Sequence, residues 1–127
     1  MAKVLIVDDD PFARQLMRDS LSLSGDDHEI VEVERGRLAL EVIAAERPDL
    51  VLLDIALPEL DGIPICAVIK RRPATSAVRI IIVSAHTGPD CVATCLREGA
   101  SAYVTKPFQP ADLVREVRRV LADKVAA

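Results

Sequence analysis

The sequence contains few aromatic residues and few cysteines. It has no tryptophan, one tyrosine and two phenylalanines among 127 residues, so it offers no set of stacking platforms for single-stranded nucleic acid. Its three cysteines are an odd number without the spacing of a disulfide framework, which is typical of a reducing compartment. These scarcities argue against a disulfide-stapled secreted domain and against a protein that stacks on unpaired bases.

Long apolar runs and an excess of basic residues are also missing. No stretch reaches the roughly eighteen apolar residues of a membrane span, and the start MAKVLIV leads directly into a strand pattern without a basic segment and cleavage site. The formal charge is −4 and the basic residues are scattered, which argues against a nucleic-acid surface. We therefore expect a cytoplasmic protein that binds neither nucleic acid nor membrane.

What the sequence does contain is enough apolar material for one core. Half of the residues are apolar, which suits a single domain over 1–127. Short β-branched runs alternate five times with segments of helical period, and this alternation is typical of parallel strands joined by helical crossovers. We predict an α/β domain with a five-stranded parallel sheet, doubly wound and flavodoxin-like, in the strand order 2-1-3-4-5. The expected strands are 3–7, 29–34, 50–54, 79–85 and 102–105.

The apolar pattern also indicates how these elements are buried. Four strands are apolar almost throughout, as strands covered on both faces must be. The run 29–34 alternates instead, which predicts an edge strand with Val31 and Val33 inward. Gly25 and Gly99 stand where helix ends need a left-handed residue. The expected helical stripes are Ala13, Leu16, Met17 and Leu21; Ile65, Val68 and Ile69; Val92, Cys95 and Leu96; and Leu113, Val117, Val120 and Leu121.

Acidic side chains are expected to meet at the carboxyl ends of two strands. The first strand ends in Asp8, Asp9 and Asp10, and the third ends in Asp54. In the predicted order these strands are neighbours at the point where the winding reverses, which is where ligand sites form in such sheets. Crowded carboxylates repel one another unless some are protonated or a cation lies among them. Because Mg²⁺ takes oxygen ligands and is usually held by one or two carboxylates plus phosphate oxygens, we expect a Mg²⁺ site.

A simpler interpretation exists for each of these residues. The run DDD alone would most often be a solvated turn and helix cap before PFARQ, and Asp54 alone could cap a loop. Taken singly, Ser84 suits a satisfied hydroxyl and Lys106 a solvated charge. Their positions favour a common site, because Ser84 ends the fourth strand and Lys106 follows the fifth.

Together these side chains suit phosphoryl transfer, in which catalysis is mostly positioning and charge neutralisation. Asp54 would attack as a carboxylate nucleophile and form an acyl phosphate. A metal held by Asp8 and Asp9 would neutralise charge on the phosphoryl oxygens. Lys106 would neutralise another oxygen, and the Ser84 hydroxyl would hydrogen-bond a third.

Four pieces of the sequence closely resemble the receiver domain of two-component response regulators. They are VLIVDDDPFAR, LLDIALPELDG, IIIVSA and AYVTKPF, in order and at family-like spacing, and the resemblance covers essentially the whole chain. It implies that Asp54 accepts a phosphoryl group from a histidine kinase or a histidine phosphotransfer protein. It also implies that Mg²⁺ is bound by Asp8, Asp9, Asp54 and the backbone carbonyl of Ala56.

The same resemblance assigns roles around the acceptor. Ser84 would be the switch hydroxyl, Lys106 the lysine that contacts the phosphate, and Tyr103 the aromatic residue that changes rotamer on activation. A cis peptide would join Lys106 to Pro107. Phosphorylation would then alter the surface formed by the fourth helix, the fifth strand and the fifth helix, and a downstream target protein would bind there. The protein would not be an enzyme in the ordinary sense, because it would catalyse only its own phosphorylation and dephosphorylation.

Three other functions stay open at this point. A phosphohydrolase of the haloacid dehalogenase type usually needs a second aspartate two residues after the nucleophile, where this sequence has Ala56. Flavin binding needs a phosphate loop rich in Ser, Thr and Gly, whereas DDDPF would repel phosphate. A pseudo-receiver would bind partners without phosphorylation, and the intact set of site residues counts against it.

The sequence leaves further questions undecided. Ala56 and His86 occupy positions that influence acyl-phosphate hydrolysis in this family, so the phosphoryl lifetime stays open. Cys91 and Cys95 could share a metal, but no further ligand is evident, and core packing is the favoured interpretation for Cys95. The sequence does not separate a stand-alone regulator from the receiver of a longer one, and it leaves open whether phosphorylation drives homodimer formation.

Overall fold

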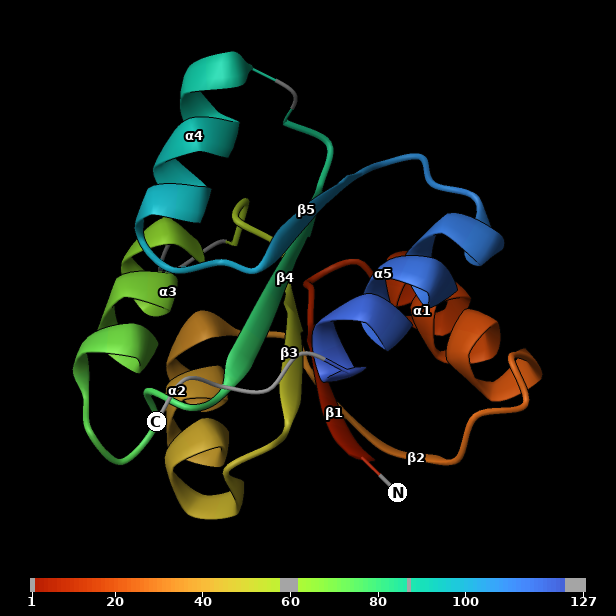
Figure 1. Cartoon of the computed structure of the whole chain (residues 1–127), viewed down its shortest axis with the longest axis horizontal. Coiled ribbons are helices and arrows are strands. Elements are labelled where there is room, and N and C mark those ends of the chain that lie inside the picture. Colours follow the sequence, from red (N-terminus) through yellow and green to blue (C-terminus); the bar gives the residue numbers. More distant parts are fainter. Residues whose placement is uncertain (1, 58–61, 87, 123–127) are drawn as a thin grey trace.

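The computed structural model describes residues 2–57, 62–86 and 88–122, and it shows a parallel sheet between two layers of helices (Figure 1). The strands are β1 (Ala2–Val7), β2 (His28–Val33), β3 (Leu50–Leu53), β4 (Arg79–Ser84) and β5 (Ala102–Thr105). The helices are α1 (Pro11–Leu23), α2 (Gly36–Glu46), α3 (Gly62–Arg71), α4 (Pro89–Arg97) and α5 (Pro110–Ala122). Residues 58–61 of the piece LLDIALPELDG lie outside the described range.

The sheet has the order β2-β1-β3-β4-β5, and all of its neighbouring strands are parallel. This confirms the predicted flavodoxin-like α/β fold and its strand order. The observed strand limits differ from the expected ones by at most one residue at each end, so that β3 ends at Leu53 and Asp54 is the first residue after it. The described part of the chain contains no helix long and apolar enough to cross a membrane.

Both faces of the sheet are covered, which explains why its central strands are apolar throughout. Helices α1 and α5 lie on one face, and α2, α3 and α4 lie on the other (Figure 1). Side chains alternate along a strand, so β1 contributes to two cores. Leu5 and Val7 pack in the cluster with α2, α3 and α4, whereas Val4 and Ile6 pack with α1 and α5. All four of these side chains are buried.

Strand β2 lies at the edge of the sheet, as its alternating sequence predicts. Val33 is buried and Val31 is partly buried, while Glu32 points outward between them. The Glu32 carboxylate contacts two arginines of α1, at 2.6 Å from Arg18 Nε and 3.4 Å from Arg14 Nε. This acidic side chain therefore links the edge strand to the helix that follows β1.

Helix ends largely follow the expected signals. Gly25 and Gly99 have φ angles of +85° and +110°, which confirms their left-handed conformation. Cys95 is buried, as expected for core packing. The expected stripes were wrong for Leu16 and Leu96, which are 42% and 46% exposed. Leu16 directly precedes the buried Met17, and Leu96 directly follows the buried Cys95. Because consecutive residues of a helix are rotated by about 100°, these two leucines face away from the core.

Truncating a core leucine should cost far more stability than truncating an exposed one. Leu52 in β3 has no exposed surface, so Leu52→Ala should lower the free energy of unfolding by about 2 to 5 kcal/mol through lost burial and a residual cavity. Leu23→Ala is the matched control, since this side chain is 86% exposed, and it should change stability by less than about 0.5 kcal/mol. Urea unfolding followed by circular dichroism measures both values. Equal losses for the two variants would contradict the arrangement of the core.

Candidate functional site

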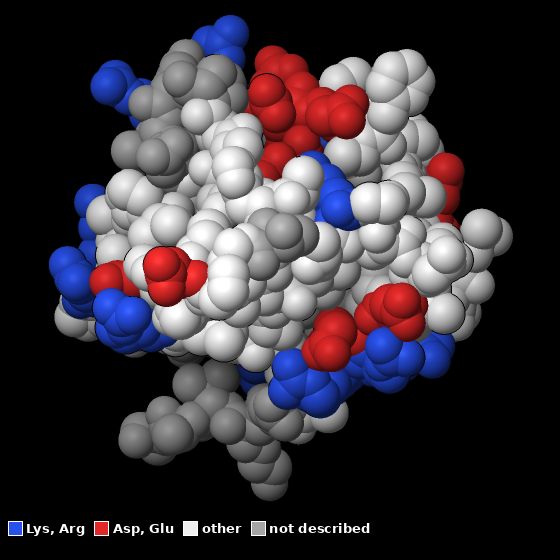
Figure 2. All heavy atoms as spheres, turned by 90° about the horizontal axis from the view of Figure 1, so that it is seen from above, with Lys and Arg blue, Asp and Glu red and all other residues white. Residues whose placement is uncertain are grey.

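Three aspartates meet at the carboxyl edge of the sheet because β1 and β3 are neighbours. Val7 is paired with Leu53, and the Asp54 amide donates to the Val7 carbonyl at 3.0 Å. Asp8 and Asp9 follow β1 directly, and one carboxylate oxygen from each of these two residues and Asp54 lies within 4.8 Å of the others. Figure 2 looks onto this edge and shows acidic atoms gathered in one place with basic atoms beside them.

Two of the three carboxylates are withdrawn from water. Asp8 has no exposed surface and Asp54 is 7% exposed, whereas Asp9 is exposed. Burial raises the pKa of Asp8 because the charged form loses its hydration, and hydrogen bonds from Lys106 and from the Asp10 amide only partly offset this effect. The groups of the protein around Asp8 therefore offset only part of the cost of keeping its carboxylate charged.

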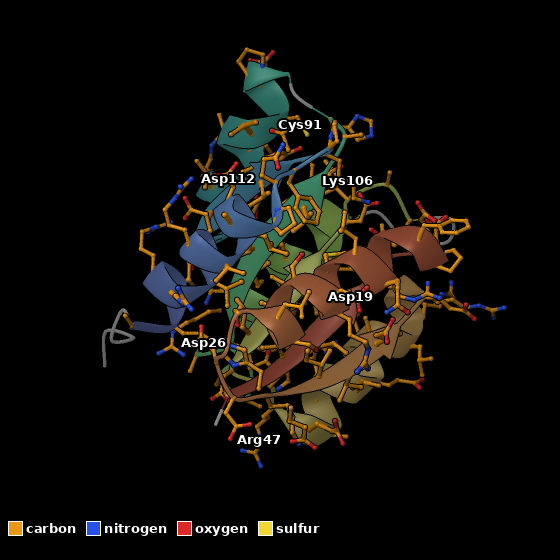
Figure 3. All side chains as sticks on the ribbon, turned by 90° about the vertical axis from the view of Figure 1, so that its right-hand side faces the viewer. Asp19, Asp26, Arg47, Cys91, Lys106 and Asp112 are labelled. Atoms are coloured by element: carbon orange, nitrogen blue, oxygen red, sulfur yellow. The ribbon has the colours of Figure 1, made fainter. Side chains whose placement is uncertain are left out.

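Lys106 is the cation that the fold places against these acids. It follows β5, and its Nζ lies 2.5 Å from Asp8 Oδ2 and 3.1 Å from Asp54 Oδ2. Burial by itself would lower the pKa of Lys106, but the hydrogen bond with Asp8 and the charges of Asp8 and Asp54 outweigh it and raise the pKa. Figure 3 shows Lys106 at the end of the sheet opposite to Arg47. The peptide that joins Lys106 to Pro107 is cis, as expected.

The Asp54 side chain is held in one orientation from two sides. Its Oδ1 accepts a hydrogen bond from the Ala56 amide at 3.0 Å, and its Oδ2 faces Lys106. Gly62 lies against the backbone of Asp54, and an added Cβ at this position would come within 2.6 Å of the Asp54 carbonyl oxygen, so the close approach requires a glycine. Sequence reasoning did not single out Gly62, although the glycine that closes the piece LPELDG was a signal for it.

Ser84 and Tyr103 both connect to the backbone of His86. Ser84 is buried at the end of β4, and its hydroxyl oxygen accepts from the His86 amide at 3.4 Å. The Tyr103 hydroxyl donates to the His86 carbonyl. Burial, together with the neighbouring Cys91, raises the pKa of Tyr103 to about 12, so its hydroxyl is a donor at neutral pH. The hydrogen bonds of the described residues do not join Ser84 to Asp54 directly.

The run DDD divides between two roles. Asp10 caps α1, since its Oδ1 accepts from the Phe12 amide at 3.0 Å. The Asp10 amide donates to Asp8 Oδ1 at 2.9 Å, which fixes the orientation of that carboxylate. Arg14 contributes a contact that sequence reasoning missed, because its Nη1 donates to the Asp8 carbonyl at 2.6 Å. The cap and the acidic cluster are therefore both present, on different residues of the run.

The donor set fits a hard divalent cation. Asp8, Asp9 and Asp54 offer only oxygen ligands, and three ionised carboxylates with one lysine leave two negative charges. Among the described residues, no group of three or more metal-ligating side chains includes Cys91 or Cys95. Any metal role is thus best supported at the aspartates.

Comparison with known proteins supports the same reading of the site. The model of the response regulator receiver domain family matches residues 4–118. The sequence is 39% identical over 116 residues to the DNA-binding response regulator MtrA of Mycolicibacterium smegmatis, covering 91% of this chain and 49% of MtrA. It is 37% identical over the same length to MtrA of Mycobacterium leprae, again with 91% and 49% coverage.

Solved structures agree with these sequence matches. A putative response regulator from Chloroflexus aurantiacus superimposes with a TM-score of 0.89 at 30% identity, covering 96% of this chain and 98% of that one. The chemotaxis response regulator CheY4 of Vibrio cholerae gives a TM-score of 0.85 at 28% identity, with 94% and 98% coverage. The chain belongs to the response regulator receiver domain family. It spans about half the length of the MtrA proteins that it matches.

Replacing Lys106 should show how much the buried Asp8 carboxylate lowers the free energy of unfolding when it has no ammonium partner. Lys106→Met leaves Asp8 without its ammonium partner, and in metal-free buffer at pH 7 it should lower the free energy of unfolding by about 3 kcal/mol. The pKa of Asp8 already lies above its ordinary value of 3.8 and should rise further in the variant. Because the folded state then binds more protons than the unfolded state, the deficit should shrink as the pH falls from 7 toward 5.

Urea unfolding at both pH values measures this deficit. Arg115→Met is the control, because it removes an exposed ion pair with Asp112 and should change stability by less than about 1 kcal/mol at either pH. A Lys106→Met deficit that is the same at pH 5 and pH 7 would show that an uncompensated Asp8 charge is not its cause.

Proposed function

We propose that the protein is a phosphorylation-dependent signalling switch that accepts a phosphoryl group on Asp54 from a histidine kinase or a histidine phosphotransfer protein. The observation that carries this proposal is the orientation of the Asp54 carboxylate between the Ala56 amide and the Lys106 ammonium, beside Asp8 and Asp9. Membership of the receiver family supports it as well.

The chemistry needs one nucleophile and several positive or polar groups. A carboxylate oxygen of Asp54 would form the new bond to phosphorus while the bond from phosphorus to the donor nitrogen breaks, and the nitrogen would keep that electron pair. Lys106 would stay protonated and offset charge on a phosphoryl oxygen, in line with its raised pKa. The Ser84 hydroxyl would donate a further hydrogen bond. Mg²⁺, held by Asp8, Asp9, Asp54 and the carbonyl of Ala56, would supply charge that offsets the phosphoryl oxygens.

On this proposal the protein acts on no external substrate and catalyses only its own phosphorylation and dephosphorylation. Ala56 supports this over the phosphohydrolase alternative, because its methyl group supplies no general acid two residues after Asp54. The acidic run around Asp8 disfavours a flavin phosphate in the same place, since the carboxylates would repel it. Retention of the acceptor, the acids and the lysine in contact supports a working receiver over a pseudo-receiver.

The signal would leave the site through the loop after β4. Ser84 and Tyr103 both bond to His86, so a Ser84 that moves toward a phosphoryl group would disturb the Tyr103 contact. Tyr103 lies in β5, beside α4 and α5, and that surface would bind a downstream target protein. MtrA is described as DNA-binding, but it is about twice as long as this chain. The net charge of −4 supports a receiver that binds no nucleic acid itself.

Phosphorylation should depend on one aspartate and on a divalent cation. Incubation with a small acyl-phosphate donor and Mg²⁺ should add one phosphoryl group, seen by intact mass after rapid acid quenching. Asp54→Asn or removal of Mg²⁺ with a chelator should abolish the adduct, because the nucleophile or the offsetting charge is then missing. Asp112→Asn, which changes an exposed aspartate of α5, should leave the adduct in place. An adduct that persists in Asp54→Asn would place the acceptor elsewhere.

Substitutions at Asp9 and at Asp10 of the run DDD should have different effects on the affinity for Mg²⁺. Asp9→Asn removes a member of the acidic cluster, so it should weaken Mg²⁺ binding by roughly tenfold or more. Asp10→Asn should bind Mg²⁺ like the wild type, because Asp10 is the cap of α1 and asparagine caps helices equally well. Isothermal titration calorimetry measures the affinity, because the protein has no tryptophan whose fluorescence could report metal binding. Equal weakening in both variants would mean that the cluster is not the binding site.

A further inference from the structure

Arg14 lies behind the acidic cluster, close to the start of α1. Its side chain is only 16% exposed although it carries a full charge. Helix α1 begins at Pro11, and the side chains of a helix tilt toward its N-terminus, so an arginine near this end can reach back to the preceding chain. Arg14 does so, because its Nη1 donates to the Asp8 carbonyl at 2.6 Å. The proposed phosphoryl transfer uses Asp8 and Asp9 but gives this guanidinium no part.

The carbonyl that Arg14 contacts belongs to the peptide that joins two expected metal ligands. A peptide group is planar, and its plane contains the Cα atoms of both residues that it joins. Fixing the Asp8 carbonyl therefore fixes the plane from which the side chains of Asp8 and Asp9 leave. Asp8 is also held at its amide, which donates to the Val33 carbonyl at 3.1 Å. Asp9 is exposed, so the direction of its carboxylate depends more on the shared peptide.

A carboxylate of the edge strand limits how far the Arg14 guanidinium can move. Glu32 of β2 lies 3.4 Å from Arg14 Nε, while Arg14 Nη1 contacts the Asp8 carbonyl. Arg18, one turn further along α1, holds the same carboxylate at 2.6 Å and also donates to the Ile30 carbonyl at 3.4 Å. Because a guanidinium is planar, contacts at Nε and Nη1 together define its orientation. Arg14 thus connects the peptide between Asp8 and Asp9 to the edge of the sheet.

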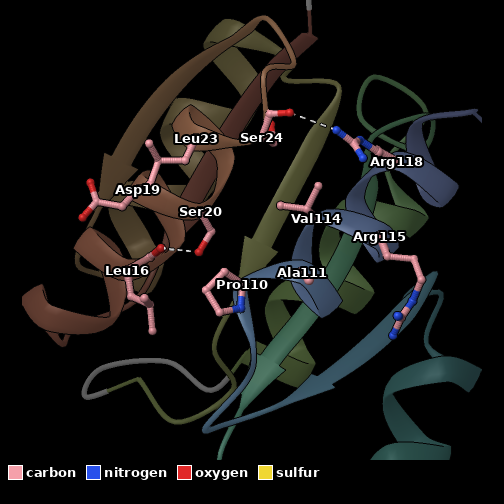
Figure 4. Close-up of a pocket in the computed structure, with 10 residues that line it drawn as sticks. All are labelled: Leu16, Asp19, Ser20, Leu23, Ser24, Pro110, Ala111, Val114, Arg115 and Arg118. Atoms are coloured by element: carbon pink, nitrogen blue, oxygen red, sulfur yellow. Dashed lines mark hydrogen bonds between the residues drawn. The ribbon is translucent and has the colours of Figure 1, made fainter.

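These contacts lie on a different side of α1 from its groove with α5. Leu16 and Ser20 of α1 line that groove (Figure 4). Arg14 precedes Leu16 by two residues, which is about 200° around a helix, so its side chain points away from the groove and toward β2. A substitution at Arg14 therefore tests its contacts with Asp8 and Glu32 without changing the groove.

We propose that Arg14 is a positioning residue for the divalent cation, which holds the peptide between Asp8 and Asp9 so that both carboxylates face the same point beside Asp54. This inference rests on the proposed function, in which these aspartates hold Mg²⁺. Groups that orient the ligands of a metal typically change its affinity by about 10- to 100-fold. Because Arg14 contacts the backbone and not a carboxylate, we expect the lower end, with Mg²⁺ binding about tenfold weaker in its absence.

The charge of Arg14 alone would have the opposite effect. A positive charge near a cation site repels the cation, so its removal would strengthen Mg²⁺ binding. The ion pair with Glu32 keeps this effect small, because the carboxylate offsets the charge of the guanidinium. The direction of the change in affinity therefore separates a positioning role from a purely electrostatic one.

Arg14→Met and Arg18→Met form a matched pair for the test. Each removes an arginine of α1 that contacts Glu32, and of the two it is Arg14 that contacts the Asp8 carbonyl. Isothermal titration calorimetry should show Mg²⁺ binding about tenfold weaker in Arg14→Met and changed by less than about twofold in Arg18→Met. Urea unfolding with and without Mg²⁺ is a second measurement. Mg²⁺ stabilises a folded form that binds it, so this increase reports the affinity separately from each variant's own stability.

Phosphorylation separates this inference from the proposed function. The Mg²⁺ concentration that half-saturates adduct formation from a small acyl-phosphate donor should rise about tenfold in Arg14→Met, whereas the rate at saturating Mg²⁺ should stay close to that of the wild type. An Arg14→Met variant that binds Mg²⁺ as tightly as the wild type or more tightly, or an equal loss in Arg18→Met, would overturn the role of Arg14. A wild type that binds Mg²⁺ but gains no phosphoryl group would overturn the proposed function instead.

Discussion

The charge balance of two buried carboxylates is the constraint on which the rest of this structure depends. Asp8 and Asp54 lie at one edge of the sheet with almost no access to water, and burial, together with the charge of Asp54, raises the pKa of Asp8. Lys106 offsets one charge from the far strand β5. The remaining negative charge suits a divalent cation, and a cation bound there would offset the repulsion between the acidic site and a phosphoryl group.

The strand order makes this balance achievable with short connections. Because β2 lies outside β1, the ends of β1 and β3 are adjacent, and their aspartates meet without any long loop. Strands β4 and β5 bring Ser84 and Lys106 to the same edge. The hydrogen bonds from His86 and Tyr103 then join this edge to the loop that precedes α4. The loop that precedes α4 is thus tied to the edge of the sheet that carries Asp54.

The sequence allowed the fold to be predicted, and it also indicated that Asp8, Asp9, Asp54 and Lys106 would lie close together, because all four follow strand ends at one edge of the sheet. The alternation of Val31, Glu32 and Val33 identified the edge strand, and the ends of the buried strands located Asp54 and Lys106. Other features depend on contacts that no local pattern encodes. Three identical side chains in DDD could not reveal that Asp10 caps α1 while its neighbours join the cluster.

The same limit applies to features formed by distant segments. Leu16 fits a core stripe by its spacing, but it lies beside a groove whose other wall comes from α5, almost a hundred residues later in the chain. The glycine of the piece LLDIALPELDG was a signal for a special backbone position, but the contact of Gly62 with the Asp54 carbonyl depends on how β3 and α3 are placed together. Helical periodicity describes one helix at a time, whereas a groove or a tight approach belongs to two segments.

Anomalous diffraction from crystals grown with Mn²⁺ tests the central claim most directly. The claim is that Asp8, Asp9 and Asp54 form one cation site beside the acceptor carboxylate and Lys106. We predict a single strong peak at this edge of the sheet, in contact with oxygens of all three aspartates. A peak at another group of acids, or no peak at Mn²⁺ concentrations that saturate binding in solution, would contradict it.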